Sequence, residues 1–456
     1  MTGAVRFGWF GIFRLGLVQA SIAAVVVLTT STLNRVMVVE LALPAALPGF
    51  LIALHYLVQI SRPRFGYGSD VGGRRVPWIL GGMATLCIGG VAAACATWLM
   101  AFHPLAGIGL ALLAFLLIGM GVGACGTSLL VLLAARVESH RRAAAATLTW
   151  LMMIASFAIT AGTVGALLDP FSFGRLVLIC AAVAALALLV TTAAVWRIEP
   201  RGQQGQGQAQ SAPAEETQDS PGFMAALREV LREPHTRRFT IFVFLSMLAY
   251  SAQDLVLEPF AGAVFALTPG QSTQLGGLQH GGVLTGMLLV ALLGTLGREG
   301  RSGILRALML AGCLASASLL VALAIGGFRA GSWPLHLNVF ALGLANGMFA
   351  VAAIGAMMGL VSQGQSQRDG MRMGVWGAAQ AVAFGLGGLA GTVAIDVTRW
   401  LLGSLPLSYA IVFAAQAALF AAAAWLGRSI TSAPAGARSQ PRFTAAMARV
   451  QAVSEN

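Results

Sequence analysis

Residues 105–134 read LAGIGLALLAFLLIGMGVGACGTSLLVLLA and contain no charged side chain. A helix needs about 20 predominantly apolar residues to cross the hydrocarbon core of a bilayer. The stretch exceeds that length, so it predicts a transmembrane helix. Its apolar residues occur on every side of such a helix rather than along one stripe, which is typical of a segment surrounded by lipid and other helices.

The rest of the 456-residue chain repeats this pattern. Hydrophobic residues make up 57% of the sequence and charged residues 10%, whereas charged residues form about 25% of soluble domains. We therefore predict an all-α integral membrane protein with twelve transmembrane helices. The apolar runs cover residues 15–36, 42–60, 78–100, 105–134, 144–168, 175–196, 239–264, 276–297, 303–326, 336–361, 373–396 and 407–427.

The distribution of arginine orients these helices. The 28 basic residues are all arginine and exceed the 16 acidic residues by 12. Such an excess can indicate a nucleic-acid-binding protein, but here its location argues against that class. If the N-terminus is inside, the arginines that face outside are Arg35, Arg175, Arg329 and Arg399. Because arginine concentrates in cytoplasmic loops, we expect both termini in the cytoplasm.

One hydrophilic segment divides the apolar runs six and six. Residues 200–221 read PRGQQGQGQAQSAPAEETQDSP, which is typical of a flexible linker. The residues GFMAALREVLREP that follow predict an amphipathic helix on the membrane surface, with a soluble linker helix as the alternative. The expected organisation is an N-terminal six-helix bundle (1–199), a cytoplasmic linker with this helix (200–237), a C-terminal six-helix bundle (238–428) and a cytoplasmic tail (429–456).

The loop after the second run carries the strongest local motif. Residues 66–75 read GYGSDVGGRR, which matches G-x-x-x-D-x-x-G-R-[RK] at Gly66, Asp70, Gly73, Arg74 and Arg75. Glycine permits a tight reversal, while an aspartate can cap a helix and pair with arginine to hold neighbouring helices in one conformation. An ordinary arginine-rich loop is the alternative. The spacing resembles the signature loop of the major facilitator superfamily, which implies two six-helix bundles and a gate at this loop.

Three longer stretches narrow the resemblance. They are NRVMVVELALPAALPGFLIALHYLVQISRPRFGYGSDVGGRR (34–75), FLSMLAYSAQDLVLEPFAGAVFALTPGQSTQL (244–275) and QRDGMRMGVWGAAQAVAFGLGGLAGTVAIDV (367–397). They look like the PucC/LhaA family, also called the bacteriochlorophyll delivery family, a branch of the major facilitator superfamily in phototrophic bacteria. The resemblance covers the whole chain from the first span to the twelfth.

This resemblance implies an assembly factor for light-harvesting antenna complexes in the photosynthetic intracytoplasmic part of the bacterial inner membrane. Such a factor delivers bacteriochlorophyll to the antenna polypeptides or chaperones them. Its expected partners are these polypeptides, the reaction-centre core complex, pigments and lipids.

Polar residues inside the apolar runs are the next candidates, because a charge in hydrocarbon is costly. Gln253, Asp254 and Glu258 lie close together in the seventh run, and the two acids are one helical turn apart. They could line a cavity, form a proton-linked site, or pair with Arg35 at the outer end of the first run. Asn346 in the tenth run is interpreted as a packing residue.

A pigment site would need an axial ligand to magnesium, which imidazole, amide or carboxylate groups can supply, and an apolar surface. Among the six histidines, His55 and His280 lie within apolar runs and occupy similar places in the two halves. Gln59, one turn after His55, and Gln279, beside His280, could orient them or bind in their place. The alternative is that each histidine is hydrogen-bonded to a neighbour.

Two other function classes were weighed. A secondary transporter of a small solute would use the same two-bundle design, but it should line its cavity with several convergent polar groups, and these spans offer few. An enzyme of pigment synthesis is not expected, because prenyl transfer needs aspartate-rich metal-binding loops and no nucleophile with a neighbouring base is evident. The five cysteines lie in apolar runs and predict packing roles, so no metal is expected other than a pigment's magnesium.

Overall fold

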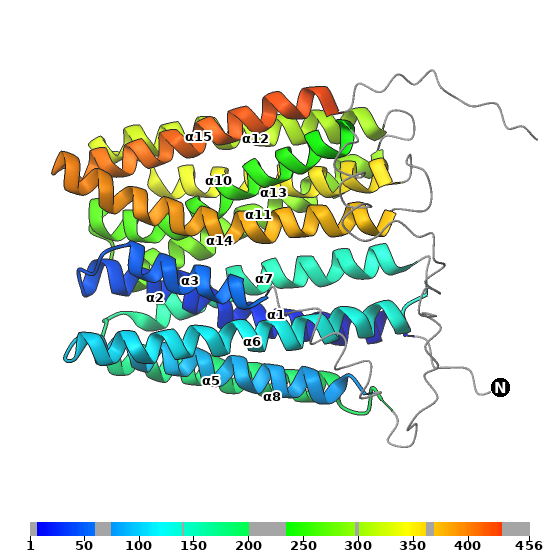
Figure 1. Ribbon diagram of the computed structural model, residues 1–456, viewed down its shortest axis with the longest axis horizontal. Helices are drawn as coiled ribbons and strands as arrows, with labels where there is room; N and C mark the ends of the chain where they lie inside the picture. The colour runs from blue at the N-terminus through cyan, green and yellow to red at the C-terminus, as the bar shows by residue number, and fades with distance from the viewer. Residues whose placement is uncertain are drawn as a thin grey trace, which may run out of the picture.

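The computed structural model describes residues 7–59, 74–138, 141–199, 234–296, 301–361 and 369–430. Within these residues eleven helices are long and apolar enough to cross a membrane, and they lie side by side along one direction (Figure 1). The architecture is therefore the all-helical membrane fold that the sequence predicts.

The first half begins with a continuous helix, Trp9–Glu40. It consists of α1 (Trp9–Val27), a π-helical segment (Leu28–Thr32), the short α2 (Leu33–Arg35) and a second π-helical segment (Val36–Glu40). The other helices of this half are α3 (Ala46–Val58), α5 (Val76–Met100), α6 (Pro104–Arg136), α7 (Arg142–Leu168) and α8 (Phe173–Val195).

The second half follows the same up-and-down pattern. Its helices are α10 (Pro234–Phe265), α11 (Pro269–Leu296), α12 (Arg301–Gly326), α13 (Leu335–Val361), α14 (Asp369–Leu402) and α15 (Leu405–Ile430). We call the end at which α8 ends and α10 begins the linker end, and the end at which α7 ends and α11 begins the distal end. The predicted linker at 200–221, the amphipathic helix after it, and the tail from residue 431 lie outside the described residues.

The first two predicted spans differ from the structure. The first span was expected at 15–36, but the helix covers 32 residues, Trp9–Glu40. Polar contacts of Arg35, described below, hold its distal end. The second was expected at 42–60, whereas α3 has 13 residues. At 1.5 Å per residue that is about 20 Å, less than the hydrocarbon thickness of about 30 Å.

Each half has its own hydrophobic core. The first core is formed mainly by side chains from α1 to α8, such as Leu15, Leu86 and Phe115, and the second mainly by side chains from α10 to α15, such as Phe260 and Phe413. Figure 1 shows the two sets of helices as two layers, with α3 and α7 against the second half. The halves therefore meet along a long interface, and polar side chains cross it.

Glycine allows neighbouring helices within each half to approach closely. A Cβ atom on Gly121 of α6 would lie 2.5 Å from the backbone nitrogen of Leu86 on α5. In the second half, a Cβ on Gly343 of α13 would collide with the carbonyl oxygen of Gln279 on α11. Small residues are what membrane helices use for such backbone contacts. The glycines at these positions therefore serve packing.

Candidate functional site between the two halves

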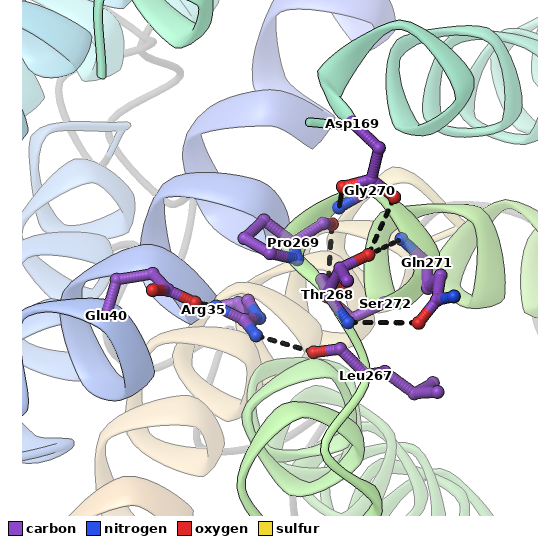
Figure 2. A network of polar contacts seen from close by, with 9 residues as sticks. All are labelled: Arg35, Glu40, Asp169, Leu267, Thr268, Pro269, Gly270, Gln271 and Ser272. Atoms are coloured by element: carbon purple, nitrogen blue, oxygen red, sulfur yellow. Dashed lines mark hydrogen bonds and ion pairs between the residues drawn. The ribbon is translucent and has the colours of Figure 1, made fainter. Parts of the chain in front are cut away.

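Arg35 joins the end of the first helix to the second half. It is 2% exposed, and its Nη1 donates to Glu40 Oε1 at 2.5 Å while Nη2 donates to the carbonyl oxygen of Leu267 at 2.7 Å. Leu267 belongs to the link between α10 and α11 (Figure 2). Gly262 of α10 leaves room for the guanidinium, since a Cβ there would lie 2.8 Å from Nη2. The arginine therefore bonds two segments far apart in the sequence.

The acids of α10 are placed differently from one another. Glu258 is buried and its Oε1 accepts a hydrogen bond from the hydroxyl of Ser31 at 2.5 Å. Its Oε2 is buried without a hydrogen-bond partner among the described residues. Asp254 is half-buried and makes no hydrogen bond or ion pair with a described residue. The ion pair with Arg35 that the sequence left open for these acids is formed instead by Glu40, which sequence reasoning missed.

Gln253 belongs to a separate polar network within the second half. Asn346 Nδ2 on α13 donates to Gln253 Oε1 at 3.1 Å, and the Ser316 hydroxyl on α12 donates to Asn346 Oδ1 at 2.8 Å. All three side chains are buried. Buried amides in apolar surroundings are retained when they bond one another, and this network holds three helices together. Asn346 is therefore a structural polar contact rather than a filler.

Asp169 forms a second bond between the halves at the distal end. It follows α7, and its carboxylate accepts a hydrogen bond from the Thr268 hydroxyl at 2.7 Å and one from the backbone N–H of Gly270 at 3.3 Å (Figure 2). Gly270 is in the first turn of α11, where an acidic group also interacts favourably with the helix dipole. Close packing supports the contact, because a Cβ on Gly270 would lie 2.5 Å from the Asp169 carboxyl carbon.

Asp396 makes the third such contact. Its two carboxylate oxygens accept hydrogen bonds from the backbone N–H groups of Ala45 and Ala46, at 2.9 and 2.7 Å, where α3 begins. The residues are 351 and 350 positions apart in the sequence. Asn34 adds a further contact, because its Nδ2 donates to the carbonyl oxygen of Leu255 at 2.8 Å. The sequence did not mark Asp169, Asp396 or Asn34 as contact residues, although each lies at or near the end of an apolar run and the last two fall in stretches that resemble the PucC/LhaA family.

The two membrane histidines face different interfaces. His55 on α3 is buried, its Nε2 lies 2.7 Å from Gln59 Nε2, and its ring is edge-on to Tyr56 with 4.8 Å between ring centroids. His280 on α11 is buried with its ring 5.0 Å from that of Phe157 on α7. The structure therefore pairs His55 with Gln59, which is one of the arrangements that the sequence left open, and it places His280 at a contact between the halves.

Two side-chain nitrogens of α11 lack hydrogen-bond partners among the described residues. They are Nδ1 of His280 and Nε2 of Gln279, and both are buried. Within the same residues no group of three or more His, Cys, Asp or Glu could hold a metal ion. An unpartnered imidazole nitrogen is nevertheless the kind of group that supplies one axial ligand to the magnesium of a pigment.

The signature loop is described only at its end. Gly66, Asp70 and Gly73 lie outside the described residues, whereas Arg74 is exposed and Arg75 is half-buried. The backbone N–H groups of Arg75 and Val76 donate to the carboxylate of Glu199, at 3.0 to 3.1 Å, so an acid after α8 caps the start of α5. The sequence analysis missed Glu199, whose only signal is an acid directly after the sixth run.

The helix order and the two halves define a protein with the fold of the major facilitator superfamily. A solved bacterial homolog of the human lysosomal transporter Spinster, in an inward-facing and occupied conformation, aligns with a TM-score of 0.69 at 14% identity over 92% of this chain and 96% of that chain. The nucleoside transporter NupG aligns with a TM-score of 0.67 at 15% identity over 92% and 100% of the two chains. These likenesses concern the fold alone.

The sequence identifies the family to which the chain belongs. The PUCC protein family matches residues 32–433, and the chain belongs to this family. It is 51% identical over 435 residues to a Rhodobacter capsulatus protein named bacteriochlorophyll synthase 44.5 kDa chain, covering 95% of this chain and 98% of that protein. It is 30% identical over 404 residues to Protein PucC of the same organism, covering 84% and 83%.

Proposed function

We propose that this protein is a membrane assembly factor for bacterial light-harvesting antenna complexes, and that it delivers bacteriochlorophyll to the antenna polypeptides or chaperones them. The observation that carries the proposal is the full-length relationship to a protein whose name refers to bacteriochlorophyll, at 51% identity over 98% of its length. The expected location is the photosynthetic inner membrane, with both termini in the cytoplasm.

The interior supports an apolar cargo rather than a small polar solute. Several polar side chains described above are engaged in bonds that join the two halves or different helices: Arg35 with Leu267, Gln253 with Asn346, and Ser31 with Glu258. Transporters of polar solutes instead direct several unengaged polar groups toward a site at mid-membrane. An enzymatic role is not part of the proposal, because the sequence lacks the aspartate-rich diphosphate-binding loops that prenyl transfer uses.

The side chains that would hold a pigment are His280 and Gln279, with His55 and Gln59 as the counterparts in the first half. The unpartnered Nδ1 of His280 fits an axial ligand to magnesium, and Phe157 beside it offers an aromatic surface. When bound, the pigment would supply light absorption in the near infrared. The protein's part is to hold and orient it in apolar surroundings.

The expected protein partners are the antenna polypeptides and the reaction-centre core complex. Apolar side chains on the outer face of α8, including Leu178, Leu186 and Leu189, are more than 60% exposed. In a bilayer such a face contacts lipid or another apolar helix. This is the type of surface that a short antenna helix could pack against during assembly.

A secondary transporter remains the second candidate, and one structural observation favours it. The polar bonds of Arg35, Asp169 and Asp396 join the halves at the distal end. A molecule held closed at one end is what alternating access requires in one of its two states. The same arrangement would also serve the release of a pigment.

Deleting the gene tests the proposed function. We expect the deletion strain to lose most of its assembled antenna while its pigment-synthesis enzymes stay active, because the defect lies in assembly. Near-infrared absorption of purified membranes measures assembled antenna, and pigment precursors in extracts measure synthesis. Normal antenna absorption would exclude the assembly role, and accumulation of a late pigment precursor would indicate an enzymatic role.

Complementation of the same strain sharpens the test. A His280→Leu variant should restore less antenna than the wild-type gene does, and should carry less near-infrared absorption after purification. His103→Leu is the matched control, because His103 is exposed at the distal end. If both variants restore the antenna fully, His280 is not the pigment ligand, although the assembly role itself would stand.

A further inference from the structure

A groove separates the start of α5 from the end of α8 at the linker end. Its volume is about 540 Å³. Pro77 and Leu80 of α5 form one wall, and Val195 and Trp196 at the end of α8 form the other. These side chains are apolar, so the body of the groove suits a hydrocarbon chain better than a polar solute.

Three charged residues surround the mouth of this groove: Arg74, Arg197 and Glu199. Both arginines are exposed, and neither makes an ion pair or a side-chain hydrogen bond with a described residue. The carboxylate of Glu199 is already engaged by the backbone N–H groups at the start of α5. Among the described residues, the mouth therefore carries two arginines and one carboxylate, and that carboxylate already accepts backbone hydrogen bonds.

Exposed apolar side chains lie next to the groove. Trp196 is 59% exposed at its edge, and tryptophan is enriched where hydrocarbon meets water. Farther along α8, Leu186 and Leu189 are exposed. In a bilayer, a tryptophan and two arginines at the end of an apolar helix are expected at the depth of the lipid phosphate groups.

We infer that this groove binds an anionic phospholipid, whose phosphate lies between Arg74 and Arg197 and whose acyl chain follows Leu80 and Val195. Arginine suits this role, because its planar guanidinium binds phosphate oxygens through paired hydrogen bonds. Charge complementarity selects an anionic lipid over a zwitterionic one. The inference is independent of the proposed cargo and of which side of the membrane the linker end faces.

Native mass spectrometry of the full-length protein in detergent tests the inference, with palmitoyl-oleoyl phosphatidylglycerol and the matching phosphatidylcholine as probes. We expect the first bound molecule of phosphatidylglycerol to have a higher affinity than the first bound molecule of phosphatidylcholine. The double variant Arg74→Gln/Arg197→Gln should lower the affinity for phosphatidylglycerol by about 30-fold, since each basic residue near an anionic membrane surface contributes about fivefold in affinity. The matched control is Arg237→Gln/Arg238→Gln, which removes two exposed arginines from α10 and should leave that affinity unchanged.

Four outcomes would overturn the inference. Equal affinity of the wild type and the Arg74/Arg197 variant would show that the groove is not the site. An equal loss in the Arg237/Arg238 control would reduce the effect to general surface charge. Full competition by millimolar inorganic phosphate, or equal binding of dihexanoyl phosphatidylglycerol, would exclude the acyl groove. A thermal melting curve shows that each variant is folded before its affinity is compared.

Discussion

The distal end and the linker end of the molecule are held together in different ways. At the distal end, side chains of one half bond to the other half: Arg35 to Leu267, Asp169 to Thr268 and Gly270, and Asp396 to Ala45 and Ala46. At the linker end, three hydrogen-bonded contacts among described residues each stay within one half: Phe7 with Arg136, Glu199 with Arg75, and Arg306 with Arg428.

This difference indicates which end opens more easily. Separating the halves at the distal end would break several hydrogen bonds to charged groups, each contributing about 1.5–3 kcal/mol. The described contacts at the linker end would survive such a separation, because they do not cross between the halves. If the arginine-rich end faces the cytoplasm, as the sequence predicts, the closed end faces away from it.

Arg35→Met should have the largest effect on this arrangement. The substitution leaves the Glu40 carboxylate and the Leu267 carbonyl without their shared donor, so we expect the free energy of unfolding to fall by about 3 kcal/mol. Chemical denaturation of the purified protein in detergent micelles measures it. Arg329→Met is the control, because Arg329 is exposed at the same end and its loss should change stability by about 0.5 kcal/mol or less. Equal effects of the two would refute the role of Arg35.

Asp169→Ala should have an intermediate effect, mainly on the equilibrium between closed and open distal ends. Removing the acceptor of Thr268 and Gly270 weakens the closed form by about 1.5 kcal/mol, which is roughly a tenfold shift in population. A cysteine introduced at Ser272, which is buried at this end, reports the shift through its rate of labelling by a water-soluble maleimide. The reference is the labelling rate of Ser272→Cys in the chain that retains Asp169. An unchanged rate would mean that Asp169 does not hold the end closed.

The helices of this fold are visible in the sequence because lipid imposes a length and an apolar composition on each. The runs predicted at 78–100 and 144–168 differ from α5 (Val76–Met100) and α7 (Arg142–Leu168) by two residues at most. Boundaries were less accurate where polar residues end a helix. The first helix continues to Glu40 because Glu40 pairs with Arg35 and is thereby tolerated at the end of an apolar segment.

The partners of the polar side chains were much harder to predict. The sequence indicates that a buried acid or amide needs a partner, but not which one. Asp396 reaches a backbone 350 positions away, and Asn346 bonds Gln253 across 93 positions. Such pairs are decided by how helices from distant parts of the chain pack, so a single sequence carries no local trace of them. The sequence places His55 and His280 in the membrane, but it does not indicate which helices they contact.

Glu199→Ala should have the smallest effect on stability, and it distinguishes the contacts of the two ends most clearly. Loss of a helix-capping acceptor destabilises by about 1 kcal/mol, and here it frees the N–H groups of Arg75 and Val76. Hydrogen exchange should therefore accelerate at these amides while that of Gly270 stays unchanged. Asp169→Ala should show the reverse pattern. If Glu199→Ala also speeds exchange at Gly270, the two ends are mechanically coupled, and the distal contacts alone would not account for the closed state.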